Sequence, residues 1–458
     1  MLRAASTFLT AVTLTVLCGI PANASPPVAA AEARVCSAPS TPSSGFERAT
    51  AAEVGMDSAA LQRAVDFASS RLRTNIQIFK NNCLVGEGPA NNITENTPWH
   101  LWSSTKSVVA MVAGVAVTEG LLDVDAPIGQ YLPLGQGDEA HRAITVRALL
   151  NQSSGLAQAV ISEALASGLD LGIDAPGEAL QLPIVAPGQF QYSQRGTDLL
   201  AYVIEKAVGE DLQAFAQRTL FDPVGISARD YYWARDRTGH TYGFAKLLMP
   251  PHDFARLGML MLNDGTWNGK RIISSAYINE LRAPSPDNAC YGFLFWLNRS
   301  PCTGPSLPSQ KTLDVTPLAG LPDDAYAMVG FLQQNNFIVP SLDLQVTWTG
   351  VFGDVSPDFA TLISASTNSE LYHEFFGQLI QALPPYVDSV APYVPTPNND
   401  VNIGEFFDPN IVLGSLGIGD LASQLGGEVA APLAGTPFGC FLLACLPISS
   451  DTPHRVGS

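Results

Sequence analysis

The amino-acid sequence predicts an α/β (α+β) fold in which a central antiparallel sheet is flanked by helices and interrupted by an inserted all-helical subdomain. Two short strand patterns come early in the chain, and strand patterns return only over residues 291–349. Between them, residues 140–285 follow mainly helical patterns. A last amphipathic stretch, residues 370–383, predicts a closing helix. A helical insertion between two halves of one sheet is the simplest architecture for this order of elements.

The ends of the chain predict segments outside this domain. Residues 1–24 show a secretory signal pattern, with a positive start, a short apolar run and a small-x-small cleavage site. Residues 25–44 are rich in Ala, Pro and Ser, and we expect a flexible leader there. The folded domain is assigned to residues 45–388 and a Pro- and Gly-rich extension to residues 389–458. The mature chain is therefore expected to be secreted or to lie in the periplasm or cell envelope.

Local signals predict the first elements of the domain. Asp57 can cap a helix whose apolar residues follow at helical spacing. Two strands are expected next, at residues 75–79 and 83–86. The Asn81-Asn82 pair between them suits a tight hairpin turn.

The second half of the sheet is predicted from later strand patterns, at residues 291–296, 336–339 and 344–349. The helical section that precedes them is expected to contain loops at residues 183–188 and 235–242, where Pro, Gly and polar residues gather. The sheet should therefore be completed only after the chain has passed through the helical section.

The charge of the chain limits its partners. The formal net charge is −18 at pH 7, and no cluster of Lys and Arg occurs in the sequence. A nucleic-acid partner is excluded on this ground, because binding to phosphates requires a basic surface. The tail after residue 389 leaves two roles open, packing on the domain or contact with the membrane or cell envelope. The oligomeric state is not predicted.

Cysteine content indicates disulfides. Cys18 lies in the predicted signal segment, and an even number of cysteines remains, which in an exported chain favours pairing. Two pairs lie close in the sequence, Cys290 with Cys302 and Cys440 with Cys445, and the pairing of Cys36 and Cys83 stays open. No cysteine or histidine pair has zinc-finger spacing and no His-Glu-x-x-His occurs, so we expect neither a metal nor another cofactor.

Ser103 and Lys106 stand at the head of a buried helix predicted over residues 108–119, which ends at Gly120. Positions i and i+3 share one helix face, so the two side chains should point into the same space. The helix N-terminus favours a developing oxyanion, and burial favours a neutral lysine that can act as a base. We therefore expect Ser103 as nucleophile and Lys106 as base. An ordinary surface helix start is the alternative interpretation.

Other segments supply candidate partners for this pair. Tyr192 stands at a loop-to-helix junction, where its phenol can enter a cleft, although a base role requires a neighbouring cation that lowers its pKa. A packing tyrosine is the alternative. Gly330 allows close backbone approach, so that an N–H near Phe331 can hold an oxyanion. Tyr242 is a weaker candidate for substrate contact.

Taken in order, these features resemble the serine β-lactamase and penicillin-binding-protein superfamily over about residues 46–385. The branch that they resemble contains class C β-lactamases and related esterases, D-amino-acid peptidases and 6-aminohexanoate-dimer hydrolases. The similar segments are Ser103-Ser-Thr-Lys106, Tyr131-Leu-Pro and residues 120–128, 144–156, 252–273 and 291–296. Together they are specific, although none is so alone.

The sequence departs from the family pattern at two motifs. The family carries Tyr-x-Asn, which Tyr192 matches, but Gln194 stands in place of the Asn. The basic residue usual before the third motif is absent, and the segment resembles a Gly-x-x-Gly-Gln pattern in which Gln334 matches and Gln333 replaces the second Gly. In relatives that bind β-lactams this cation helps to hold the substrate carboxylate. Its absence argues against β-lactams and D-Ala-D-Ala peptides as preferred substrates.

The resemblance implies a β-lactamase-like fold and a serine hydrolase that works without a cofactor. Such an enzyme would cleave an ester or amide bond of a small molecule or short peptide through an acyl-enzyme on Ser103. Lys106 and Tyr192 would serve as the general base, and Gly330, Phe331, Gln194 and Tyr242 would contact the oxyanion or substrate. Two alternatives remain: a β-lactamase or D,D-peptidase, and a non-catalytic envelope binding protein with a degenerate fold.

Overall fold

A six-stranded antiparallel sheet is central to the computed structural model, which describes residues 32–41, 44–157, 174–304, 312–351, 369–384 and 392–394. Its strand order is β2-β1-β13-β12-β11-β8. The strands span β1 Arg73–Lys80, β2 Cys83–Glu87, β8 Trp296–Leu297, β11 Tyr326–Gly330, β12 Gln334–Val339 and β13 Leu344–Gly350. Pairing of β1 with β13 joins the early hairpin to the late strands, as the sequence predicted.

The β1–β2 hairpin forms where it was expected. Asn81 and Asn82 take positive φ angles of 52° and 62°, the backbone of a two-residue type I′ turn, which asparagine tolerates better than most residues. The turn fixes the register, so that Lys80 faces Cys83 across the hairpin.

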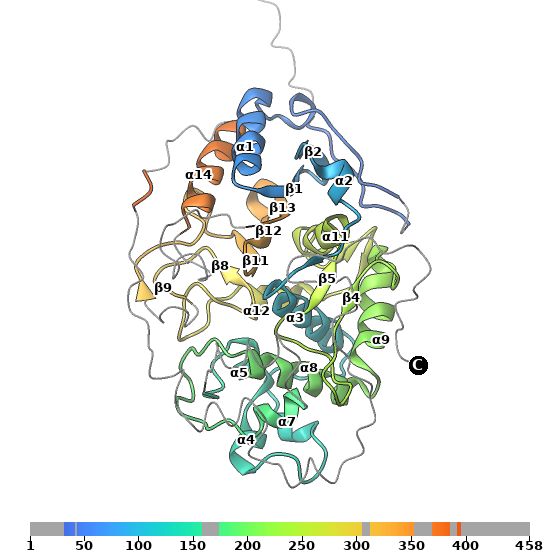
Figure 1. The fold of residues 1–458 in the computed structure, drawn as a ribbon, viewed down its shortest axis with the longest axis vertical. Helices are drawn as coiled ribbons and strands as arrows, with labels where there is room; N and C mark the ends of the chain where they lie inside the picture. Colours follow the sequence, from blue (N-terminus) through green and yellow to red (C-terminus); the bar gives the residue numbers. More distant parts are fainter. Residues whose placement is uncertain are drawn as a thin grey trace, which may run out of the picture. The chain divides into compact units, whose positions relative to one another are not determined.

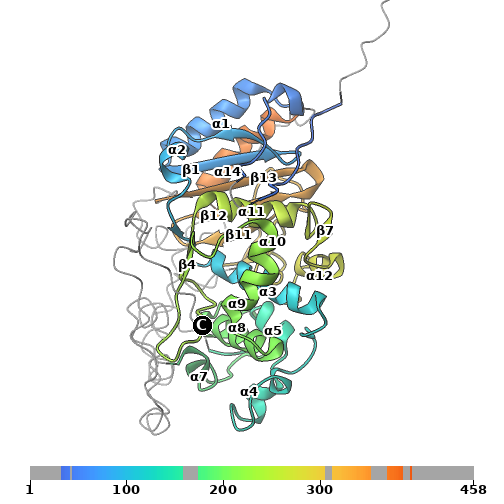
Figure 2. The same cartoon turned by 90° about the vertical axis from the view of Figure 1, so that its right-hand side faces the viewer.

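Two helices cover one face of the sheet, α1 Ser58–Ser70 and α14 Glu370–Leu379 (Figures 1 and 2). Asp57 caps α1 as predicted, because its carboxylate accepts a hydrogen bond of 2.7 Å from Ala60 N. The strands turn alternate apolar residues to these helices, and Ile76, Val346 and Trp348 join one buried cluster with them.

The opposite face of the central strands packs on α11 Pro251–Leu262 (Figure 2). Here the contact is partly polar. Asn336 donates to Phe254 O at 2.7 Å and Gln345 donates to Ala255 O at 2.8 Å. Gly258 is required at this crossing, because a Cβ there would lie 2.1 Å from Asn336 Oδ1.

The inserted section between the two halves of the sheet is helical, which confirms the expected architecture (Figure 1). Its helix α8 packs against α3, α5, α7 and α9. Short strands also occur in this section and form a small sheet of order β3-β5-β4. The helices are α2 Asn91–Thr94, α3 Ser104–Thr118, α4 Glu139–Ala143, α5 Val146–Leu150, α7 Ala175–Ala179, α8 Gln194–Val208, α9 Leu212–Ala216, α10 Asp222–Val224 and α12 Ser275–Leu281. The strands of this small sheet are β3 Trp99–His100, β4 Tyr232–Trp233 and β5 Leu247–Met249. Two separate strand pairs are β6 Thr266–Trp267 with β7 Lys270–Arg271 and, after β8, β9 Cys302–Thr303 with β10 Thr312–Leu313.

The strand predicted over residues 291–296 was wrong. Only its last residue enters β8, and the rest turns back on itself, with Gly292 N donating to Phe295 O and Leu294 at a φ of 56°. Aromatic residues at this point suggested a strand, but they are instead buried in the large hydrophobic core. The backbone of Leu294 is held there by hydrogen bonds to Leu150 of α5 and Ser107 of α3. Strand β11 of the central sheet was not predicted.

The amino-terminal segment is fixed to the domain from Arg34 onward, although residues 25–44 were expected to form a flexible leader. Arg34 N donates to Glu53 O at 2.8 Å, and Trp267 Nε1 donates to Pro39 O. A disulfide joins Cys36 to Cys83 across 47 residues. Chain composition does not reveal such long-range bonds, so this part of the expectation fails.

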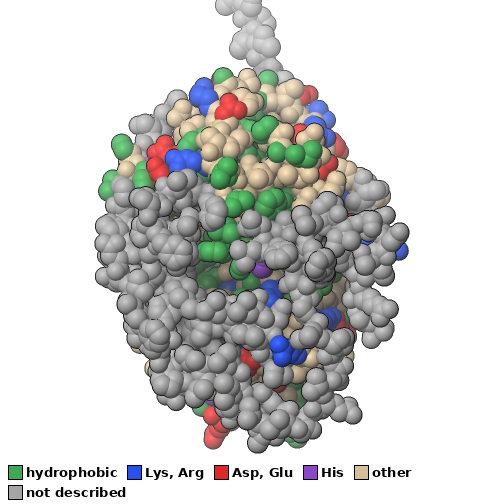
Figure 3. Space-filling model, viewed as in Figure 1, with side chains coloured by type: hydrophobic (Ala, Val, Ile, Leu, Met, Phe, Trp, Pro, Cys, Tyr) green, Lys and Arg blue, Asp and Glu red, His purple; other side chains and the backbone are tan. Residues whose placement is uncertain are grey.

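The second disulfide joins Cys290 to Cys302, one of the two pairs that lie close in the sequence. The other such pair, Cys440 with Cys445, lies outside the described residues, as do the predicted signal segment and almost all of the predicted extension. No helix in the described ranges combines the length and the apolar character needed to cross a bilayer. Figure 3 shows acidic and basic side chains intermingled on the described part of one face.

Candidate active site

Helix α3 determines how deeply the side chains of Ser103 and Lys106 are buried. Ser103 is its N-cap and is half-buried, whereas Lys106, one turn further in, is only 1% exposed. The first turn is held in place because Ser104 Oγ donates to Gln334 O of β12 at 2.8 Å. The hydroxyl therefore lies near the surface of the site and the amine lies beneath it, out of bulk solvent.

Oxygen atoms of Ser103, Gln194 and Phe244 lie around the Lys106 amine. Its Nζ lies 3.3 Å from Ser103 Oγ, 2.5 Å from Gln194 Oε1 and 2.9 Å from Phe244 O. Gln194 is the first residue of α8, so the longer side chain at the family's Asn position does reach the lysine. The Phe244 carbonyl is a partner that sequence patterns did not reveal, because any residue could supply it.

Tyr192 lies directly against this pair. Its phenol is hydrogen-bonded to the Ser103 hydroxyl, and Lys106 Nζ lies 4.8 Å from the centre of its ring. Burial raises the pKa of Tyr192 to about 12, and the hydrogen bond to Ser103 lowers it only in part. The phenol is thus protonated near neutral pH, opposite to the lowered pKa that a free phenolate base would need.

This protonation state can be tested by titration. In a difference spectrum between wild type and Tyr192→Phe, we expect no phenolate absorbance below about pH 11, because the Tyr192 proton is held by burial. Absorbance of the two proteins is measured from neutral to alkaline pH. A phenolate signal that belongs to Tyr192 and appears below pH 10 would contradict the burial argument.

The turn between β11 and β12 lies beside the start of α3. Gly330 ends β11, and a Cβ there would stand 2.2 Å from Leu101 O, so only glycine permits this approach. The Phe331 ring packs edge-on against Trp102, with centroids 5.2 Å apart. Gln333 has a φ of 63°, the left-handed region that explains why related patterns carry glycine there.

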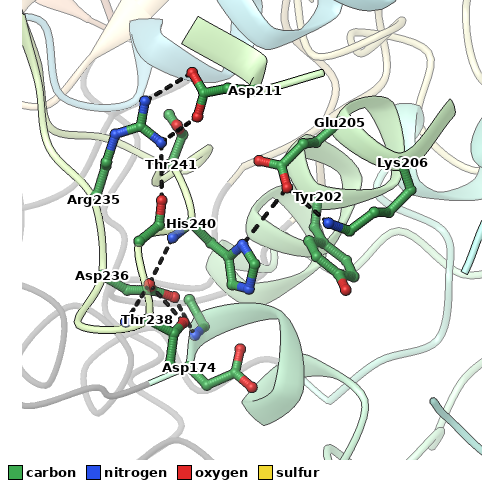
Figure 4. A network of polar contacts seen from close by, with 12 residues as sticks. Asp174, Tyr202, Glu205, Lys206, Asp211, Arg235, Asp236, Thr238, His240 and Thr241 are labelled. Atoms are coloured by element: carbon green, nitrogen blue, oxygen red, sulfur yellow. Dashed lines mark hydrogen bonds and ion pairs between the residues drawn. The ribbon is translucent and has the colours of Figure 1, made fainter. Parts of the chain in front are cut away.

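The loop predicted at residues 235–242 is held by charged side chains (Figure 4). Arg235 donates to both carboxylate oxygens of Asp211, at 2.5 and 2.8 Å. Asp236 Oδ1 accepts the His240 N–H at 2.8 Å, and its other oxygen accepts the N–H of the first residue of α7. The segment that follows this loop is therefore fixed where it reaches Lys106.

Tyr242 is the last residue of that loop and is only 1% exposed, which leaves little surface for a substrate. Its ring packs on Phe244 with centroids 5.8 Å apart and lies 4.9 Å from Lys246 Nζ. His100, which is close to Ser103 in the sequence, stacks on Trp102. Its Nε2 accepts the backbone N–H of Lys246 at 3.1 Å, so the imidazole supports the site.

Among the described residues, no three His, Cys, Asp or Glu side chains are grouped so that they could hold a metal ion. The site instead consists of a hydroxyl, an amine, a phenol and amide oxygens. An amine one helical turn beneath a hydroxyl can accept its proton, and the neighbouring phenol can pass that proton on.

Comparison with known proteins gives matches over this region. A family model described as Beta-lactamase matches residues 79–350. The chain is 23% identical over 197 residues to the 6-aminohexanoate-dimer hydrolase of Paenarthrobacter ureafaciens, covering 40% of this chain and 50% of that protein. It is 31% identical over 151 residues to esterase EstB of Burkholderia gladioli, covering 29% of this chain and 38% of that protein. The chain thus spans half the length of the first relative and less of the second.

A solved structure supports the fold. EstCE1, described as a hydrolase with promiscuous acyltransferase activity, superposes with a TM-score of 0.52 at 15% identity, covering 70% of this chain and 99% of that one. Together with the family match, this confirms the predicted β-lactamase-like architecture of an antiparallel sheet with helices on both faces and a helical insertion.

Proposed function

The chain belongs to the beta-lactamase family, whose model covers more than half of it, and on that premise we propose that it is a serine hydrolase cleaving an ester or amide bond. The observation that carries the proposal is the 3.3 Å contact between Lys106 Nζ and Ser103 Oγ. It combines a half-exposed hydroxyl with a buried amine, the arrangement that nucleophilic catalysis requires.

In the proposed acylation step, Ser103 Oγ forms a bond to the substrate carbonyl carbon while its proton passes to neutral Lys106. A neutral amine has two N–H groups and one lone pair. If the N–H groups bond to Gln194 Oε1 and Phe244 O, the lone pair is directed at Ser103 Oγ. Tyr192, protonated and bonded to Ser103, relays the proton to the leaving group.

The oxyanion of the tetrahedral intermediate needs hydrogen-bond donors. We assign this role to the N–H groups of Ser103, at the start of α3, and of Phe331, after Gly330. The close approach of Gly330 to Leu101 O supports the assignment, because it brings the β11 edge against the backbone before Ser103. A water molecule then attacks the acyl carbon, and its proton passes to neutral Lys106, directly or through the Tyr192 hydroxyl. The same proton returns to Ser103 Oγ as the bond between that oxygen and the acyl group breaks and the acid leaves.

The proposed substrates are small ester or amide molecules or short peptides. Two curated relatives, named 6-aminohexanoate-dimer hydrolase and esterase EstB, support this class. The missing basic residue before Gly330 favours it as well. We also propose that the protein is exported, since its disulfides at Cys36–Cys83 and Cys290–Cys302 form most readily in oxidising compartments.

The substrate class is tested with a panel of p-nitrophenyl esters, nitrocefin, D-amino-acid amides and short oligoamides. We expect turnover of esters or oligoamides that Ser103→Ala abolishes, and slow or no turnover of nitrocefin. Fast nitrocefin turnover would support the β-lactamase or D,D-peptidase alternative. If no acyl-enzyme can be trapped and detected by mass spectrometry with any substrate, the non-catalytic binding protein becomes the better description.

A further inference from the structure

A buried carboxylate holds the backbone segment that contacts Lys106. Asp198 Oδ1 accepts the N–H of Gly243 at 2.8 Å and that of Phe244 at 3.2 Å. The carbonyl of the same Phe244 residue accepts the Lys106 amine at 2.9 Å. The carboxylate is 1% exposed. One side chain of α8 thus sets the position of an acceptor on which the amine depends.

The geometry of Gly243 shows independently how closely this segment is fitted to α8. A Cβ at this position would lie 2.3 Å from Thr197 O and 3.1 Å from Ala201 Cβ. The backbone therefore rests directly on the helix, and any side chain at position 243 would push it away. The carbonyl of Phe244 would move with it.

An ion cluster fixes the carboxylate itself. Arg195 donates to Asp198 Oδ2 at 2.9 Å and lies 2.6 Å from Glu178 Oε2 of α7, and all three side chains are buried. Burial raises the pKa of Asp198, while Arg195 and the two backbone N–H groups oppose this rise. Because Arg195 holds the Oδ2 atom of Asp198, the Oδ1 atom faces the backbone of residues 243–244.

We propose that Asp198 is a positioning residue for Lys106, acting through the backbone of Phe244. This inference rests on the proposed function, in which Lys106 must present a lone pair to Ser103. Gln194 and Asp198 stand four residues apart on one face of α8, so a single helix supplies one acceptor directly and places the other. With both acceptors in place, both N–H groups of a neutral amine can be engaged while its lone pair faces the hydroxyl.

The test compares three variants by the rate at which a fluorophosphonate probe labels Ser103. Asp198→Ala removes the acceptor, and Gly243→Ala displaces the same backbone without touching a charge. Both should label about 10- to 100-fold more slowly, the usual effect of misplacing a catalytic group by about an ångström. The matched control Glu178→Gln alters the same ion cluster but leaves the bonds to Gly243 and Phe244, and should label within about threefold of wild type.

A second readout separates positioning from a general loss of structure. The labelling rate should fall at acidic pH as Lys106 becomes protonated, and this fall is the acid limb of the rate profile. The Phe244 carbonyl dipole favours the protonated amine, so displacing it should lower the pKa of Lys106. The acid limb should therefore move to lower pH in Asp198→Ala and in Gly243→Ala. Unfolded material lowers the labelled fraction without moving that limb. Asp198→Asn keeps an oxygen for the two N–H groups and should recover part of the rate, which also carries the test if the alanine variant does not fold.

Two outcomes would overturn the inference. One is a wild-type rate and acid limb in Asp198→Ala, Asp198→Asn and Gly243→Ala. The other is a defect in Glu178→Gln equal to that of Asp198→Ala, which would assign the effect to the ion cluster as a whole. Labelling of wild type at a residue other than Ser103 would instead refute the proposed function, so the two failures are distinguishable.

Discussion

Replacing Ser103 by alanine is expected to abolish covalent labelling by a fluorophosphonate and to lower ester hydrolysis by about 10³-fold or more. The hydroxyl lies 3.3 Å from the Lys106 amine, and alanine leaves no atom there to form the acyl bond. Labelling is followed by intact-protein mass spectrometry, and hydrolysis is followed with p-nitrophenyl esters.

Two neighbouring serines provide matched controls. Ser104 and Ser107 lie on the same helix, but their hydroxyls donate to backbone carbonyls, Gln334 O at 2.8 Å and Leu294 O at 2.7 Å. Both are almost completely buried. Ser104→Ala and Ser107→Ala should therefore still be labelled at Ser103. Full labelling of Ser103→Ala would show that another residue is the nucleophile. So would a result in which Ser107→Ala alone, among the three variants, loses its labelling.

Replacing Lys106 by methionine is expected to slow acylation about 10³-fold, the usual contribution of a general base. Methionine is close to lysine in size and fills the buried space, but it cannot accept the Ser103 proton. The wild-type acylation rate should also fall toward acidic pH, because a protonated amine has no lone pair. Stopped-flow measurement of the first turnover, from acidic to alkaline pH, separates this step from deacylation.

A lysine elsewhere controls for the substitution itself. Lys80 is partly buried on β1 and donates to Asn81 Oδ1 at 2.6 Å, remote in sequence from the site. Lys80→Met should leave the acylation rate within about twofold of wild type. Lys106→Arg retains a positive charge that does not ionise at accessible pH, so it should be as slow as Lys106→Met. An arginine variant with near wild-type acylation would mean that the charge, not the lone pair, is needed.

Several features follow from neighbouring residues and were therefore predictable. The Asp57 cap, the Asn81-Asn82 turn and the i, i+3 relation of Ser103 and Lys106 each depend on a few consecutive residues. Local dihedral preferences and hydrogen bonds act over that range. The order of strand and helix patterns likewise predicted the sheet with its helical insertion, and the structure confirms it.

Misleading local signals account for the error at residues 291–296. Phe293 and Phe295 are aromatic residues typical of a strand, but they pack in the core from a turn, because Leu294 N donates to Leu150 O. Tertiary contacts override a local preference that is worth only about 1 kcal/mol.

What the sequence by itself determined is the pair at the head of one helix, Ser103 over Lys106, and the fold class that surrounds it. Only the tertiary structure decided which oxygen atoms accept hydrogen bonds from the Lys106 amine, since Gln194 and Phe244 stand 88 and 138 residues from Lys106 in the sequence. It also decided that Cys36 pairs with Cys83. The physical reason is that a backbone carbonyl carries no residue identity and a distant contact leaves no periodic pattern, so both exist only once the chain has folded.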